Sequence, residues 1–97
     1  MLQTILIQNN FPKALKMART AQGLSQESFG LVSSRTYVSS LERGLKAPTL
    51  NKADDLAQVL GIHPLTLLAL SYAVDCPRPD VALLMQKVTD ELYKVLD

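Results

Sequence analysis

The sequence predicts an all-α fold, with a compact unit of five short helices followed by one further amphipathic helix. Two observations lead to this prediction. Apolar residues recur at helical spacing in successive segments, and Gly or Pro separates these segments at short intervals. Hydrophobic residues make up 47% of the 97 residues but aromatic residues only 5%, which suits aliphatic side chains packed in a single small domain.

The first two helices are expected over residues 11–22 and directly after Ser25. Pro12 stands in the first turn of the first helix, where a missing N–H is tolerated, and Gly23 ends that helix. Ser25 can cap the second helix. Glu27 then falls in its first turn, where the helix dipole favours a negative charge.

The third helix is expected in the segment SSRTYVSSLERG, which begins at Ser33. Ser33 or Ser34 can cap it, Val38 and Leu41 have the spacing of a buried face, and Gly44 ends it. Its other positions are mostly serine, threonine and arginine, which do not build a core. We therefore expect these polar side chains to contact something outside the domain.

Two more helices complete the compact unit. The fourth follows Thr49, a good N-cap, and ends at Gly61. The fifth begins near Pro64 and is apolar nearly all round, which predicts that it is well buried. The buried face of the fourth helix is expected to comprise Leu50, Ala53, Leu56, Ala57 and Leu60.

The chain is expected to have three parts, residues 1–10, 11–75 and 76–97. The first contains TILIQ, which has strand propensity but no partner strand, so it either pairs with its copy in a dimer or is disordered. The third opens with CPRP, a short rigid joint that disfavours helix. The last helix is expected after this joint, with Asp80 as its candidate cap.

The second and third helices are short and nearly adjacent, which is typical of a helix-turn-helix. In that motif one helix braces across the phosphate backbone and the next enters the major groove. Arg35 and Thr36 occupy the first turn of the third helix, and Ser39 and Ser40 lie one turn later, near enough to reach bases or phosphates. Tyr37 can pack with its ring and offer its hydroxyl to a phosphate.

Charge is unevenly distributed along the chain, although the formal net charge is only +1. Residues 1–52 hold seven basic and two acidic side chains, whereas residues 53–97 hold three basic and seven acidic ones. Such a division favours an anionic partner for the first half. Ordinary scatter of surface charge is the alternative.

Four motifs occur between residues 13 and 70: R-x3-GLSQE, SRTYVSxLERG, K-x-P-T-L and LA-x-x-LGI. In this order and near this spacing they resemble the lambda-repressor/Cro-like family of bacterial and phage transcription regulators. The resemblance implies a compact five-helix, lambda-repressor-like domain that binds double-stranded DNA. One departure concerns the segment between Gln26 and Glu42, which is shorter than is usual in the family. Either the bracing helix ends early or the turn is tighter.

The resemblance also implies roles for individual residues. Arg35 and Thr36 fall on the main base-reading positions, with Ser40 as a third. Arg19 and Glu42 match a pair that forms a largely structural salt bridge in several relatives. The phosphate contacts expected from the motif and from its resemblance to the family involve Gln26, Tyr37, Arg43 and Lys46.

The last helix carries an apolar seam in which residues recur at alternating four- and three-residue steps. A single reading helix contacts few bases, so a second copy one DNA turn away would roughly double the contact energy. We therefore expect the seam to form a homodimer contact. The alternative is that the helix packs back onto the five-helix unit. The expected interface comprises Val81, Leu84, Met85, Val88, Leu92 and Val95.

The sequence thus predicts a DNA-binding regulator, acting as a repressor on a palindromic operator. Two alternatives remain. The same domain serves antitoxins and controllers of restriction-modification genes, and a protein-interaction module would use the reading face for an unknown protein partner. Arg35 could also be an ordinary exposed charge.

Other classes of function find no support in the sequence. One His and one Cys far apart, without clustered carboxylates or a phosphate-cradling Gly-rich loop, supply no catalytic site and no metal or cofactor site. His63 is expected to cap or pack, and Cys76 to be an inert small hydrophobe. With no signal peptide, no membrane-spanning run and a single cysteine, a cytoplasmic protein is expected.

Overall fold

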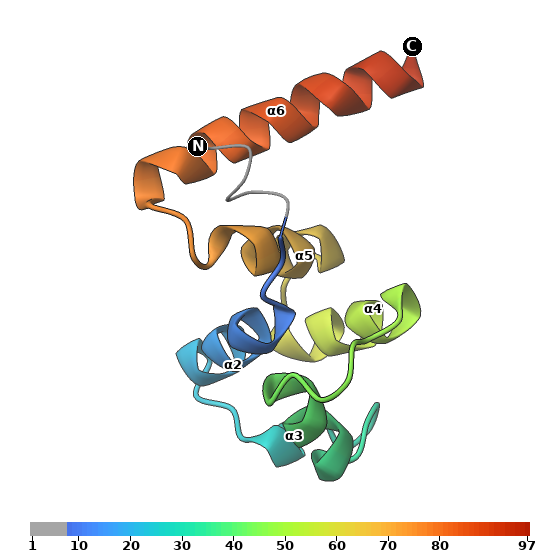
Figure 1. Cartoon of the computed structure of the whole chain (residues 1–97). Helices are drawn as coiled ribbons and strands as arrows, with labels where there is room; N and C mark the ends of the chain where they lie inside the picture. The colour runs from blue at the N-terminus through green and yellow to red at the C-terminus, as the bar shows by residue number, and fades with distance from the viewer. Residues whose placement is uncertain (1–7) are drawn as a thin grey trace.

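The computed structural model describes residues 8–97, and every regular element within them is helical (Figure 1). Residues 1–7, where a strand or disorder was expected, lie outside the described residues. Gln8, Asn9 and Asn10 lead into the first helix without regular structure. The elements in chain order are α2 (Phe11–Ala21), η1 (Gln26–Phe29), α3 (Arg35–Glu42), α4 (Leu50–Leu60), α5 (Pro64–Ala73) and α6 (Arg78–Leu96).

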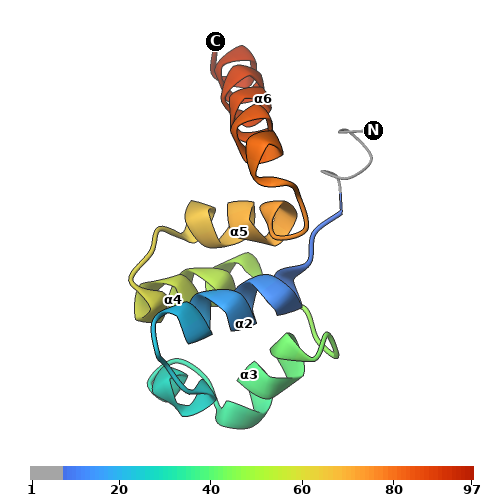
Figure 2. The same ribbon diagram turned by 90° about the vertical axis from the view of Figure 1, so that its left-hand side faces the viewer.

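The helices are stacked in levels (Figures 1 and 2). Helices α2 and α4 lie side by side in the middle, with α5 on one side of them and η1 and α3 on the other. Helix α6 lies beyond α5, at the end of the molecule farthest from α3. The all-α prediction is therefore confirmed, and α3 occupies one extremity of the molecule.

Side-chain caps begin three of the helices, as the sequence predicts. Gly44 and Gly61 follow the ends of α3 and α4 with φ of +74° and +71°, a left-handed conformation that glycine adopts without a Cβ penalty. These local signals set the lengths of α3 and α4. At the helix starts, the backbone N–H groups of Tyr37, Lys52 and Leu65 donate to the side chains of Ser34, Thr49 and His63 at 3.1, 3.1 and 3.0 Å, respectively.

One hydrophobic cluster joins all the elements before α6. Phe29 of η1 and Leu67 of α5 are both fully buried although they come from opposite sides of the stack. Because η1 buries its largest side chain, the chain must turn sharply after it to bring α3 against the same core. The cluster comprises Phe11, Leu15, Phe29, Val38, Leu41, Leu56, Ala57, Leu60 and Leu67.

The start of α2 is tied to the end of α5. The backbone N–H of Asn10 donates to the Ser71 carbonyl at 2.6 Å. The Asn10 amide and the Lys13 ammonium both donate to the Asp75 carboxylate, at 3.0 and 2.6 Å. These hydrogen bonds, from Asn10 and then Lys13, hold the pKa of Asp75 below its ordinary value. The outermost pair of helices thus closes the unit.

Two burial predictions were wrong. Leu50 is 73% exposed because it stands in the first turn of α4, ahead of the part that meets the core. Helix α5 is not buried all round, because α2 and α4 cover only one side of it. Leu67 and Ser71 are buried on that side, whereas Leu65 is exposed.

The start and the packing of α6 also differ from expectation. The helix begins at Arg78, with Pro77 rather than Asp80 at the N-cap position. Pro79 fits inside the first turn because its missing N–H would have no partner there. Leu84, expected in a dimer seam, is only 7% exposed within the single chain, so it is already covered and is not a free contact for a second copy.

We predict that Leu56→Ala lowers the free energy of unfolding by about 2–5 kcal/mol, since Leu56 is fully buried and its loss leaves a cavity. Leu50→Ala in the same helix is the matched control and should change this free energy by about 0.5 kcal/mol or less. Urea unfolding followed by circular dichroism measures both. Equal losses in the two variants would contradict the assignment of the core.

Candidate nucleic-acid interface

The expected bracing helix is reduced to the single 3-10 turn η1. Ser25 precedes it, and its backbone N–H donates to the Ser28 hydroxyl at 3.1 Å. After Phe29 the chain turns at once, because the N–H groups of Val32 and Ser33 both donate to the Phe29 carbonyl at 2.9 Å. The shortened segment between Gln26 and Glu42 is therefore accommodated in two ways, by an early end of the helix and by a tight turn.

Helix α3 presents a polar face outward while its other face is fixed in the core. Val38 and Leu41 are fully buried, and Arg35 and Thr36 in the first turn are exposed. Ser39 is half-buried on the outward side, one turn further along. Because α3 lies at the extremity of the molecule, its first turn is free to approach a large partner (Figure 1).

Ser40 does not share this outward face. It is only 8% exposed, and its carbonyl accepts a hydrogen bond from the Leu45 N–H at 2.9 Å. The loop after Gly44 thus turns back beside this part of α3. The expectation that Ser40 reads bases is wrong for this conformation, because its hydroxyl faces the interior.

Arg19 and Glu42 form the ion pair expected from the resemblance. The Arg19 Nε and Nη2 atoms donate to the two carboxylate oxygens of Glu42 at 2.6 and 2.9 Å, and Nη1 donates to the Leu24 carbonyl at 2.9 Å. The side chains are 12% and 4% exposed. Helix α2 is therefore joined to the end of α3 by a two-pronged, nearly buried contact.

Electrostatics keep this pair ionised. Burial alone raises the pKa of Glu42, but hydrogen bonds from Arg19 and Gln26, together with the charges of Arg19 and Lys16, outweigh it and lower the pKa overall. The hydrogen bond to Glu42 in turn raises the pKa of Arg19 above its ordinary value. The contact is thus charged at neutral pH.

Gln26 lies elsewhere than the resemblance implies. Its Nε2 atom donates to Glu42 Oε1 at 3.1 Å, and none of the hydrogen bonds found for residues 8–97 joins it to Arg35. Its amide therefore orients the carboxylate at the end of α3 rather than the first reading residue. One amide N–H and the carbonyl oxygen remain for other partners.

Tyr37 lies between two lysines. The ammonium groups of Lys46 and Lys52 each stand 5.7 Å from the centre of its half-buried ring, within the range of cation–π attraction. Lys52 Nζ also donates to the Val32 carbonyl at 2.6 Å. Sequence reasoning missed Lys52. Its signal is a cation in the first turn of α4, where the helix dipole disfavours positive charge.

A helix-turn-helix family model matches residues 15–67, from the middle of α2 into α5. The chain belongs to the helix-turn-helix family of the lambda-repressor/Cro type. Its members are DNA-binding transcription regulators, and so is this protein at that level of description. Comparison with curated proteins and with solved structures gives no significant match.

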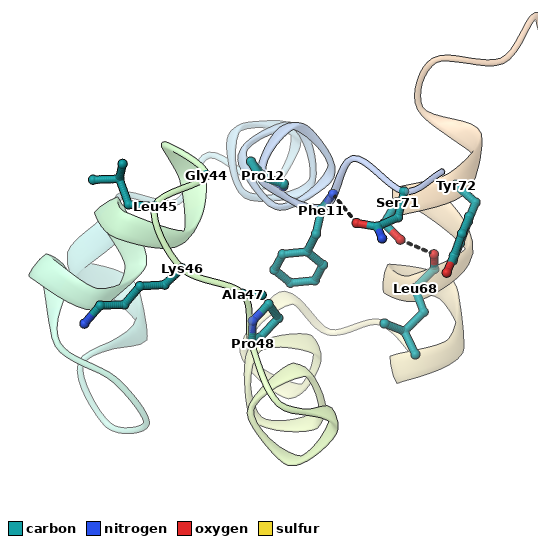
Figure 3. A pocket seen from close by; sticks show the side chains of 11 residues that line it. Phe11, Pro12, Gly44, Leu45, Lys46, Ala47, Pro48, Leu68, Ser71 and Tyr72 are labelled. Atoms are coloured by element: carbon teal, nitrogen blue, oxygen red, sulfur yellow. Dashed lines mark hydrogen bonds between the residues drawn. The ribbon is translucent and has the colours of Figure 1, made fainter. Parts of the chain in front are cut away.

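Beside the motif this helix-turn-helix protein has an open hollow of about 450 Å³, formed by the start of α2, the α3–α4 loop and α5. Figure 3 shows Phe11, Ala47, Pro48 and Leu68 around it, whereas Lys46 extends away from Phe11. The Ser71 hydroxyl in the lining donates to the Leu68 carbonyl (Figure 3). The polar group of Ser71 is therefore satisfied within α5 itself.

Two further surveys cover residues 8–97 of the helix-turn-helix protein. Within this range no group of three or more His, Cys, Asp or Glu side chains is placed to hold a metal ion. No single helix in the same range has the length and apolar character needed to cross a membrane. Helices α4 and α5 meet these criteria of length and composition only as a pair, bent by 100°.

We predict that Arg19→Met lowers the free energy of unfolding by about 3–5 kcal/mol at pH 7, because the Glu42 carboxylate stays buried without its partner. In the wild type the folded pKa of Glu42 is below the unfolded value of about 4.3, so the pair stabilises the fold above that pH and the effect fades on acidification. In the variant, burial raises the folded pKa. Its deficit should therefore shrink as the pH falls, as urea unfolding between neutral pH and pH 4 measures.

Lys13→Met is the matched control for this experiment. It removes the Lys13–Asp75 ion pair, whose side chains are half exposed, and should cost less than about 1 kcal/mol. A deficit in Arg19→Met that does not change with pH would contradict the assigned role of the buried pair.

Proposed function

We propose that the protein is a sequence-specific transcription repressor that binds a palindromic operator as a homodimer. The observation that supports this most directly is the two-sided character of α3. Its inner face is locked in the core and its end is held by Arg19, while Arg35 and Thr36 stand exposed in its first turn. A helix held this way can enter a major groove without deforming.

Arg35, Thr36 and Ser39 are the proposed base-reading residues. Within residues 8–97, none of the hydrogen bonds and ion pairs engages their side chains. The Arg35 guanidinium can donate two hydrogen bonds to the O6 and N7 atoms of guanine, the commonest specific contact of this type. Hydroxyl groups at the other two positions accept or donate and so discriminate less.

Four residues around α3 are proposed to contact phosphates. Arg43 and Lys46 are exposed beyond the end of α3 and supply positive charge on that side. Tyr37 can offer its hydroxyl beside them. Gln26, from η1, has one amide N–H left after its bond to Glu42. These contacts fix the register of the protein on DNA and release counterions, but they carry no sequence information.

The apolar face of α6 supports the proposed dimer. In the single chain Val88 is 38% exposed and Val95 85%, and Met85 and Leu92 fall between them. Val81 is half-buried. The alternative that this face packs back onto the five-helix unit is therefore wrong for most of the seam. An apolar face of this length is a liability on an isolated chain and is covered if two copies pair.

The position of α6 is compatible with simultaneous binding to two half-sites. Two reading helices of a dimer lie about 34 Å apart, one turn of DNA. A helix of 19 residues is about 28 Å long and extends from the end of the molecule opposite α3 (Figure 1). Pairing through α6 thus adds reach and leaves both reading helices uncovered.

The exposed cations favour DNA over a protein as the partner of the reading face. Arg35, Arg43 and Lys46 all remain exposed, as a polyanion requires. A dimer held on an operator would exclude polymerase from an overlapping promoter. Repression is therefore the regulatory outcome we propose.

Arg35→Ala should weaken binding to the selected operator by about 1–3 kcal/mol and remove the preference at one base pair in each half-site. Selection of bound fragments from random duplexes, followed by titration, measures both effects. The wild type should select two inverted half-sites about 10 base pairs apart. Selection of no common sequence would contradict the proposed function.

Arg43→Ala is the control for this experiment. It should weaken binding to all duplexes alike and flatten the salt dependence by about 0.9 in the log–log slope, the effect of one lost phosphate contact. An Arg35→Ala variant with the same profile as Arg43→Ala would show that Arg35 does not read bases.

Val88→Asp combined with Leu92→Asp should convert the dimer to monomers, because two carboxylates would be buried in an apolar contact. Sedimentation equilibrium measures the mass. Leu83→Asp is the control, since Leu83 is 55% exposed and lies on the opposite side of α6 from the seam. It should leave the dimer intact. Dimers that persist in the double variant would exclude α6 as the contact.

A further inference from the structure

We propose that Lys52 is a positioning residue for sequence recognition, which holds the first turn of α3 at its reading angle without contacting DNA. The inference rests on the proposed function, because it assigns to α4 a part in the choice of operator. It concerns a side chain outside the motif helices. Three observations support it.

The first observation is the pair of contacts that one ammonium group makes. Lys52 Nζ donates to the Val32 carbonyl at 2.6 Å and stands 5.7 Å from the centre of the Tyr37 ring. Val32 is in the turn before α3, and Tyr37 is in its first turn. The reading residues Arg35 and Thr36 lie between these two points. Both ends of the reading segment are therefore anchored to the same group on α4.

The second observation is the lack of other support at this end of α3. The preceding element is a single 3-10 turn, and Leu31 in the connecting turn is fully exposed. At the opposite end Glu42 is held by Arg19 and Gln26. A helix of eight residues has little stability of its own, so contacts at its ends decide its direction. Lys52 supplies this contact at the first turn.

The third observation separates Lys52 from an ordinary phosphate ligand. Lys46 lies at the same 5.7 Å from the Tyr37 ring, but it is exposed in the loop, and none of the hydrogen bonds found within residues 8–97 engages its ammonium. Lys52 is half-buried, and its ammonium is already hydrogen-bonded. Its place in the first turn of α4 opposes the helix dipole, a cost that the Val32 carbonyl offsets.

The consequence for binding is specific to the correct operator. A bidentate contact between arginine and guanine requires both donors to be in place, so a small rotation of the first turn weakens it. Phosphate contacts tolerate such a rotation because they depend on charge and distance. Loss of Lys52 should therefore reduce the affinity for the operator much more than the affinity for random DNA.

The test compares Lys52→Met with Lys46→Met in the full chain. Affinity for the operator selected by the wild type and for a random duplex is measured by fluorescence anisotropy over a range of salt concentrations. Lys52→Met should lower the ratio of the two affinities about tenfold, comparable to one mismatched base pair, with an unchanged salt slope on random DNA. Lys46→Met should keep the ratio and flatten the slope by about 0.9.

Two further variants keep the test decisive. Lys52→Arg can donate to Val32 and lie over the Tyr37 ring, so it should restore the ratio to that of the wild type. Lys52→Gln, one bond shorter and uncharged, should reproduce the loss and replaces Lys52→Met if the latter does not fold, as judged by its thermal melt. Such rescue would not occur if any side chain that preserved the fold sufficed.

Three results would overturn the inference. The first is a Lys52→Met or Lys52→Gln variant with an unchanged affinity ratio. The second is a flattened salt slope in that variant, which would make Lys52 a phosphate contact. The third is a failure of Lys52→Arg to restore the ratio. A wild type that binds operator and random duplex equally would instead refute the proposed function, so the two failures are distinguishable.

Discussion

An eight-residue helix is marginal in water, so α3 depends on groups outside itself for both its shape and its direction. Its inner face is held by Val38 and Leu41 in the shared core. Its end is held by the buried Arg19–Glu42 pair, which links it to α2. Its first turn is capped by Ser34 and flanked by the ammonium of Lys52 from α4. Only the outward side remains available, and that side is the one on which the helix-turn-helix family reads DNA.

Much of this arrangement was predictable because the relevant signals are local. The caps Ser34 and Thr49 precede apolar periodicity, and the glycines after α3 and α4 adopt the left-handed backbone that ends a helix. The Arg19–Glu42 pair is not local, and only the resemblance to the family indicated it. For the residues that read bases and contact phosphates, sequence and structure together supply candidates whose roles remain proposals.

The failures share a different cause, which is that burial depends on what the rest of the chain does. Ser40 appeared to face outward by periodicity, but the loop after Gly44 turns back beside it. Leu84 belonged to a regular seam, yet it is covered within the single chain. The contacts of Lys52 join α4 to a carbonyl 20 residues earlier, and no pattern of side chains records the position of a carbonyl.

The joint between α5 and α6 has a consequence for the operator. Two prolines, Pro77 and Pro79, lie in the few residues that separate the helices, and each restricts its own backbone rotation and that of the residue before it. In a dimer paired through α6, these torsions would determine how far apart the two halves stand. The spacer length preferred in the DNA would then be encoded by residues that never approach it.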